Sequence, residues 1–142
     1  MKSTLDTLIR LAEFTVDERR RELKEVQEKE DVLLQAKVKL AERVESEKVA
    51  AQQSTEGTFA YGQFVAWAKI ERERLEQAII DIQPELEEAR AKLSEAFAEQ
   101  KKVEITKDRK DEEEREEIKA KEQAFLDEFT TSQHIRKQKR KE

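Results

Sequence analysis

The residues that could support catalysis are few and lie far apart along the chain. The sequence of 142 residues contains one histidine, His134, and no cysteine. It also lacks a glycine-rich loop of the kind that holds phosphates. Carboxylates are abundant, but they act as general acids or bases only in a pocket that excludes water and shifts a pKa. Because metal sites also need clustered ligands, we expect no enzymatic activity, no cofactor and no metal site.

Aromatic side chains point to binding instead of catalysis, because four of the eight aromatic residues lie within nine positions. They are Phe59, Tyr61, Phe64 and Trp67. Phe64 and Trp67 are three residues apart, so they share one face of a helix. Two large aromatic side chains on an exposed face are costly unless they close the end of the fold or contact a partner. The sequence leaves both interpretations open.

A second apolar group follows a run of eleven charged residues, 107–117. Its members are Ile118, Phe125, Leu126, Phe129 and Ile135. Ile118, Phe125 and Phe129 fall near one line on a helix. Such a stripe is typical of a helix that docks in a groove of another chain. A short fold-back of the chain, or self-association, is the alternative.

The C-terminal residues 136–142 form a basic tail. Five of the six residues from 136 to 141 are Arg or Lys. Such a tail complements the negative end of a helix dipole or binds an acidic partner surface. The formal net charge of the whole chain is −5, so no global positive field favours nucleic acid. We expect protein partners, with no nucleic acid and no small-molecule substrate.

Long helices must position these residues. The chain is 44% charged and 36% apolar, with two glycines and one proline, which is typical of long helices with a coiled-coil repeat. From residue 5 to residue 51 a heptad repeat places an apolar residue at ten of fourteen positions. We call these fourteen positions and their counterparts in residues 61–103 the seam. Arg19, Glu30, Lys37 and Glu47 interrupt it.

The sequence predicts an all-α fold: a long two-helix antiparallel coiled-coil hairpin with an overhanging C-terminal helix, in a single domain of residues 1–142. The first helix should span about 4–52, with Ser3 as its N-cap. The bend should span about 53–58, and the second helix about 59–135. Facing residues should have numbers that add to about 111, which places Leu5 opposite Thr106.

Pro84 lies inside the seam of the second helix. Proline removes one backbone hydrogen bond and clashes with the preceding turn. The heptad phase continues across Ile82 and Leu86, so we expect a kink within one helix. A third helix that begins at Pro84 is the alternative, since proline suits the first helical position.

Hydropathy predicts that the chain does not enter a bilayer. The longest apolar run, residues 64–68, is far shorter than the roughly twenty residues that span a membrane. The N-terminal residues lack the apolar segment of a secretory signal. We expect a cytoplasmic protein that associates with a membrane only through protein partners.

Three motifs resemble the FliJ family of flagellar type III protein-export components. They are the opening LDTLIRLAEFTVDERRREL, the aromatic FAYGQFVAWAK after the bend, and the closing KEQAFLDEF before the basic tail. The resemblance implies a non-enzymatic, stalk-like partner of the flagellar export ATPase hexamer. It also implies contact with the cytoplasmic domain of the export gate at the inner membrane, and export chaperones are further candidate partners.

The resemblance implies two sets of binding residues. The end with both termini would enter the ATPase ring, through residues that include Leu5, Ile9, Ile118, Phe125, Leu126 and Phe129. The gate or a chaperone would contact Tyr61, Phe64, Trp67 and Ala68. Two alternatives stay open: an escort module for export substrates or their chaperones, and a structural scaffold that dimerises in parallel through its seams.

Overall fold

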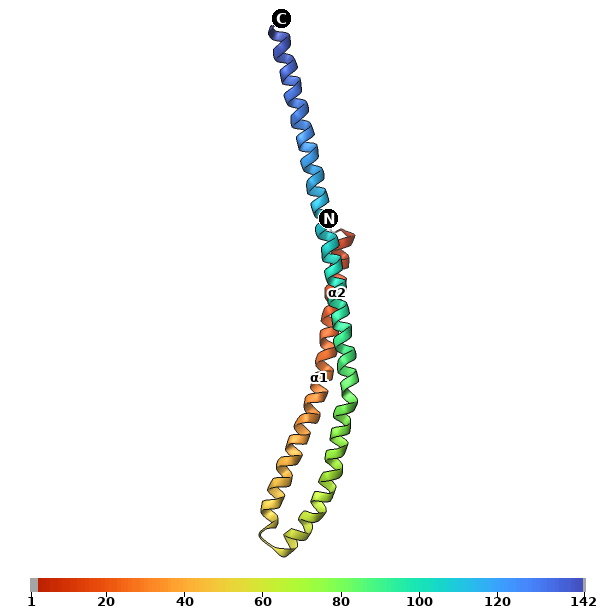
Figure 1. The fold of residues 1–142 in the computed structure, drawn as a ribbon, viewed down its shortest axis with the longest axis vertical. Coiled ribbons are helices and arrows are strands. Elements are labelled where there is room, and N and C mark those ends of the chain that lie inside the picture. The colour runs from red at the N-terminus through yellow and green to blue at the C-terminus, as the bar shows by residue number, and fades with distance from the viewer. Residues whose placement is uncertain (1–2, 142) are drawn as a thin grey trace. The chain divides into compact units, whose positions relative to one another are not determined.

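The computed structural model describes residues 3–141, and these residues form two helices and no strand. Helix α1 spans Thr4–Ala51 and helix α2 spans Thr55–Lys141. The helices group into two compact units, residues 13–98 and residues 3–12 with 99–141. In residues 13–98, α1 and α2 run in opposite directions from a short turn (Figure 1). The all-α antiparallel hairpin expected from the sequence is confirmed.

The seam supplies the packing between α1 and α2. Thirteen of its fourteen positions in α1 are buried or half-buried, and only Glu47 is exposed. In residues 13–98 the core includes Leu40, Ala68 and Leu75, and the half-buried residues packed against them are Leu33, Ala36, Val44 and Phe64. Each helix therefore covers the seam of the other. A parallel dimer through both seams would have to open this hairpin.

Two of the polar interruptions of the seam have partners on the opposite helix. Gln83 donates a hydrogen bond from Nε2 to Glu30 Oε2 over 2.8 Å, and Lys37 Nζ lies 3.4 Å from Glu76 Oε1. In both pairs the residue numbers add to 113, close to the expected register of about 111. Polar groups at these positions thus fix the alignment of the helices, because a shifted register would separate them.

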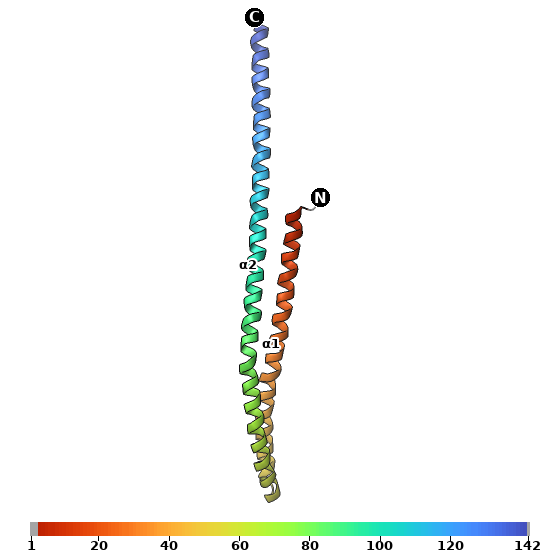
Figure 2. The same cartoon turned by 90° about the vertical axis from the view of Figure 1, so that its right-hand side faces the viewer.

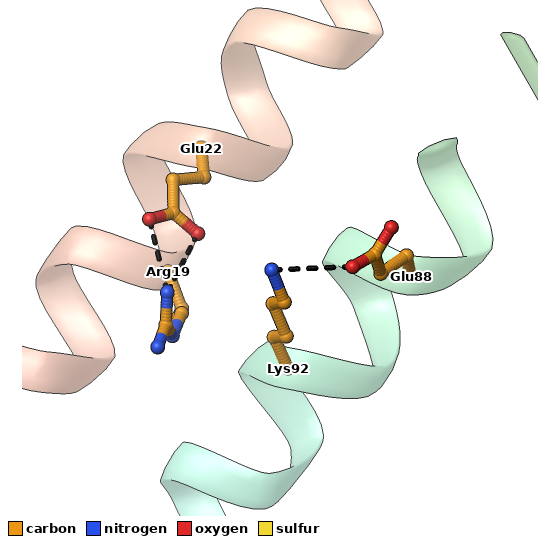
Figure 3. Close-up of polar contacts among 4 residues, drawn as sticks. All are labelled: Arg19, Glu22, Glu88 and Lys92. Atoms are coloured by element: carbon orange, nitrogen blue, oxygen red, sulfur yellow. Dashed lines mark hydrogen bonds and ion pairs between the residues drawn. The ribbon is translucent and has the colours of Figure 1, made fainter. Parts of the chain in front are cut away.

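Several further ion pairs stay within one helix and add little. Arg19 pairs with Glu22 on α1 at 3.0 Å, and Lys92 pairs with Glu88 on α2 at 3.3 Å (Figure 3). The side chains are exposed or half-exposed, and exposed pairs at this spacing contribute about 0.3–0.5 kcal/mol each. The seam, and not these pairs, holds the helices together.

Helix α1 begins at the N-cap that the sequence predicted, Ser3, and this cap is reciprocal. Asp6 donates its backbone N–H to Ser3 Oγ, and the Ser3 N–H donates to Asp6 Oδ2, each over 3.2 Å. This arrangement satisfies two backbone donors that have no partner within the helix.

The turn between the helices is shorter than the sequence suggested. It comprises only residues 52–54, because Ser54 caps α2 by accepting a hydrogen bond from the Gly57 N–H at 2.9 Å. Thr58 Oγ1 also donates to the carbonyls of Ser54 and Ala51. Residues 55–58, expected in the bend, therefore form the first turn of α2.

Helix α2 also extends further than expected at its other end. It continues through residues 136–141, which the sequence assigned to a tail. Arg, Lys and Gln are good helix formers, and no glycine or proline follows residue 84 to end the helix. Glu142 lies outside the described residues.

Gly57 is needed for close packing at the turn and not for an unusual backbone conformation. No described glycine has a positive φ. A Cβ at residue 57 would lie 2.9 Å from Ser54 Oγ and 3.3 Å from Ala51 Cα, whereas a Cβ at Gly62 would meet nothing within 4 Å. The two glycines thus differ in packing although both are helical.

Replacing each glycine by alanine tests this difference. We expect Gly62→Ala to raise the free energy of unfolding by up to about 1 kcal/mol, the difference in helix propensity. Gly57→Ala should lose this gain and lower stability by about 1 kcal/mol, because the methyl group displaces the Ser54 cap. Urea unfolding followed by circular dichroism measures both. Equal stabilisation by the two substitutions would contradict the packing argument.

Helix α2 passes through Pro84 without ending. Helix assignment is continuous on both sides of this residue, so the alternative of a third helix is wrong. Pro84 has no N–H to donate to the carbonyl of Ile80. One residue earlier, the Gln83 side chain donates to the carbonyl of Ile79 over 3.0 Å. Because Pro84 is exposed, water can reach the carbonyl of Ile80, which receives no hydrogen bond from Pro84.

Candidate partner-binding surfaces

The C-terminal part of α2 has no packing partner along 30 residues. Asp111 is the last half-buried residue, and every residue from 112 to 141 is exposed. We call residues 112–141 the exposed segment. In the unit of residues 3–12 and 99–141, α2 continues past the start of α1 (Figure 2). Helix α1 begins at Thr4, and no described residue packs against the exposed segment.

An ion pair joins the two helices close to the start of the exposed segment. Lys107 Nζ lies 2.8 Å from Asp6 Oδ1. Hydrogen bonds from Lys107 and then from the Ser3 N–H lower the pKa of Asp6 from 3.8 to about 2. The same pair raises the pKa of Lys107. Asp6 thus caps α1 and also joins the first turn of α1 to α2.

The shifted pKa predicts a loss of stability in acid. Because the pKa of Asp6 is lower in the folded chain than in the unfolded chain, its carboxylate stabilises the fold above about pH 4. This contribution should disappear as the pH falls through about 2. A titration followed by NMR should give the low pKa, and Lys107→Met should move it back towards 3.8. A pKa near 3.8 in the unaltered chain would contradict the structure.

Apolar side chains lie on the exposed segment with no cover. Phe125 is 67% exposed, and Ile118, Leu126 and Phe129 are each more than half exposed. Shallow hollows lie beside Phe125, one lined by Lys121, Glu122 and Leu126 and the other by residues that include Phe129 and Arg136. The predicted stripe is therefore present and accessible. It has the features of a surface that a groove on another chain could cover.

Leu5 and Ile9 have a different environment from the stripe. Both are half-buried on α1, at seam positions that face α2. The exposed apolar residues of the same turns are Leu8 and Leu11. The residues assigned to one surface by the resemblance thus divide into packed positions on α1 and exposed positions on α2.

The aromatic residues after the turn form a cluster with an arginine of α1. The ring centroids of Phe64 and Trp67 lie 5.6 Å apart. Arg43 Cζ lies 4.9 Å from the Phe64 centroid and 5.8 Å from the Trp67 centroid, within the range of a cation–π contact. We call Arg43, Phe64 and Trp67 the aromatic cluster. It joins α1 to α2 on the flank of the seam.

The members of the predicted gate surface differ in how accessible they are. Trp67 is 48% exposed, whereas Ala68 is 4% exposed and belongs to the core. Tyr61 and Phe64 are half-buried, and Phe64 packs against Leu40 and its neighbours. A partner could therefore contact Trp67 directly. Ala68 is buried and contributes only by packing the helix in place next to Trp67.

A sequence-family model described as the flagellar FliJ protein matches residues 1–139 of the chain. The chain belongs to the FliJ family. The resemblance drawn from the three motifs is confirmed. This FliJ-family chain is a component of the flagellar protein-export apparatus, and the family is non-catalytic.

Comparison of this FliJ-family chain with curated proteins and with solved structures finds no match. Within residues 3–141, neither helix contains an apolar segment long enough to cross a membrane. The same residues contain no group of three or more His, Cys, Asp or Glu side chains placed to hold a metal ion. Among the described residues of this family member, the surfaces suited to binding a protein partner are the exposed segment and the aromatic cluster.

Arg43, Leu8 and Leu11 are candidate contact residues of this FliJ-family chain that the sequence argument did not single out. Arg43 could have been found from the register, since a sum of about 111 places it opposite Ala68, next to Trp67. Leu8 and Leu11 are apolar residues outside the seam, three positions apart on one face. Apolar residues off the seam are the signal that would have identified them.

Proposed function

We propose that this FliJ-family protein is a stalk-like rod that couples the flagellar export ATPase to the membrane export gate. The exposed segment is the observation that carries the proposal. A helix that is uncovered along 30 residues and carries two exposed phenylalanines, Phe125 and Phe129, is suited to insertion into another assembly. The proposal places the protein at the cytoplasmic face of the inner membrane, held there by its protein partners.

The ATPase ring would enclose the exposed segment. Phe125 and Phe129 would supply the apolar contact, with Ile118 and Leu126 beside them. Leu8 and Leu11 would extend this surface onto α1, while Leu5 and Ile9 would hold α1 in place. Coupling then means that binding of the rod and the nucleotide state of the ATPase change each other's free energies. The rod itself performs no chemistry.

The export gate would bind at the aromatic cluster. Trp67 offers a half-exposed indole, and aromatic side chains of this kind are common at the centre of protein interfaces. Arg43 holds Phe64 and Trp67 against the flank of the hairpin. Because the two contacts would lie in different units of the chain, separate substitutions can disable each one.

Loss of the two exposed phenylalanines tests the ATPase contact. We expect Phe125→Ala with Phe129→Ala to weaken binding to the flagellar export ATPase at least tenfold, or about 1.4 kcal/mol, and to abolish stimulation of ATP hydrolysis. Co-sedimentation and an ATPase assay measure the two effects. The folded hairpin should be unchanged because both side chains are exposed.

A matched control uses exposed apolar residues on the hairpin itself. Val32→Ala with Ile80→Ala removes two similarly exposed side chains outside the exposed segment. We expect normal binding and stimulation. Unchanged binding and stimulation in the double phenylalanine variant would reject the ring contact.

The second candidate function is an escort module for export substrates or their chaperones. The exposure of Phe59 and Trp67 near the turn favours it, because such a surface could hold a chaperone without any ATPase. Pull-down of export chaperones with Trp67→Ala and with the double phenylalanine variant discriminates the two functions. Loss of chaperone binding only with Trp67→Ala, together with normal ATPase stimulation in both variants, would favour the escort.

A further inference from the structure

The exposed segment carries opposite charge at its two ends. Residues 112–117 comprise five glutamates and Arg115, and residues 136–141 comprise five Arg or Lys residues and Gln138. All of these side chains are exposed on α2. The apolar stripe lies between the acidic end and the basic end. The segment is thus complementary in charge to a second copy of itself that runs in the opposite direction.

The complementarity holds residue by residue. When two exposed segments overlap fully and run antiparallel, residue 112 of one copy faces residue 141 of the other. Each glutamate of 112–117 then lies level with an Arg or Lys along the common axis, so those on the face shared by the two helices meet cations of the partner. Arg115, the one cation of the acidic end, faces Gln138, the one uncharged residue of the basic end.

The same alignment covers the apolar stripe. Ile118 of one copy faces Ile135 of the other, and about the two-fold axis Phe125 lies level with Glu128 and Phe129 with Ala124. Ile118, Phe125 and Phe129 lie near one line of the helix, so one face can meet the partner along the segment. A parallel alignment would instead place acid beside acid and base beside base.

We propose that the exposed segment pairs antiparallel with the exposed segment of a second copy of this chain. The interface is isologous, so each copy contributes the same residues to it. Its centre is formed by Phe125 and Phe129, and its ends by the acidic and basic residues. The inference rests on the exposed segment alone and does not require the stalk function. Pairing and insertion into an ATPase would exclude each other, because both use the same face.

Sedimentation equilibrium of the full chain tests the pairing. We expect a concentration-dependent dimer at about 50 mM salt whose dissociation constant rises at least tenfold at about 500 mM salt, because exposed charges are screened. An unaltered chain that stays monomeric at about 100 μM in low salt, an affinity too weak for a specific contact, would overturn the proposal.

Charge-exchanged variants make the test specific. In the first, the five glutamates of 112–117 become lysine. In the second, the five cations of 136–141 become glutamate. Each variant alone should be monomeric, since both ends then carry the same sign, while an equal mixture should dimerise as the unaltered chain does. Dimerisation of each variant alone, or a monomeric mixture, would overturn the proposal. Circular dichroism verifies that the hairpin remains folded.

Unique cysteines determine the direction, because the chain has none of its own. In the antiparallel alignment Glu122→Cys of one copy faces Ser132→Cys of another within one residue. Identical positions are more than about 10 Å apart along the axis, beyond the reach of a disulfide. Oxidation should therefore cross-link the mixture and neither variant alone. Cross-linking within each variant alone would show a parallel dimer and reject the proposal.

The tests of pairing and of the stalk function are read independently. Pairing is measured on the purified chain without any ATPase. A monomeric chain that still stimulates the ATPase would reject pairing and leave the stalk function supported. A chain that dimerises, yet neither binds nor stimulates the ATPase under conditions that keep it monomeric, would support pairing and reject the stalk function.

Discussion

Replacing Leu86 by alanine lowers the free energy of unfolding by about 3 kcal/mol, the largest effect we expect from one substitution. Leu86 is 1% exposed, and it is the most completely buried large side chain among the described residues. It lies at a seam position of α2 within residues 13–98. Truncation removes its packing and leaves a cavity that two long helices can close only in part. Urea unfolding monitored by circular dichroism measures the loss.

Leu126→Ala is the matched control, because it is the same substitution on the same helix. Leu126 is more than half exposed on the exposed segment. Its truncation should change the free energy of unfolding by less than about 0.5 kcal/mol. When the chain is kept monomeric, similar losses for Leu86→Ala and Leu126→Ala would mean that the exposed segment packs against its own hairpin, which would contradict the structure.

Replacing Pro84 by alanine should stabilise the protein by about 2 kcal/mol. Alanine is favoured over proline by about 3 kcal/mol inside a helix, because it restores the hydrogen bond to the carbonyl of Ile80. The more flexible unfolded chain of the variant offsets about 0.4–1 kcal/mol of this gain. Pro84 is exposed, so the substitution removes no core packing. Thermal and urea unfolding measure the change.

Glu87→Ala serves as the control for Pro84→Ala. It is an exposed position on the same stretch of α2, where alanine should change stability by less than about 0.5 kcal/mol. Lower stability of Pro84→Ala than of the unaltered chain would contradict this account. It would show that the hairpin depends on the backbone geometry that proline imposes beside Ile82 and Leu86.

Most of the hairpin could be predicted because a single periodic property determines it. Apolar residues at the heptad spacing must face a partner helix, and thirteen of the fourteen seam positions of α1 are buried or half-buried. The Ser3 cap followed from local chemistry alone. The continuity of α2 across Pro84 followed from the unbroken phase of the repeat.

The limits of the turn could not be predicted because they depend on local competition. Glycine and serine are frequent in turns, yet they also occupy caps and first turns of helices. Ser54 accepts a hydrogen bond from Gly57, and this contact moves residues 55–58 into α2. Composition alone does not distinguish the two outcomes.

The candidate site could be predicted only in part, because periodicity locates buried residues better than contact residues. Phe125 and Phe129 were recognised since no seam remained to bury them. Arg43 was not recognised, because its role depends on which aromatic rings lie within reach on the other helix. Leu8 and Leu11 were not predicted, because they lie outside the heptad repeat that dominates the same stretch.

The absence of packing along the exposed segment has an energetic consequence. Its helical hydrogen bonds are supported by local propensity alone, and isolated helices are only marginally stable in water. The free energy needed to open this end of α2 is therefore smaller than that needed to unfold residues around Leu86. Any partner that encloses the segment must offset the free-energy cost of keeping it helical and straight. The binding free energy available for this determines how tightly the partner holds the chain.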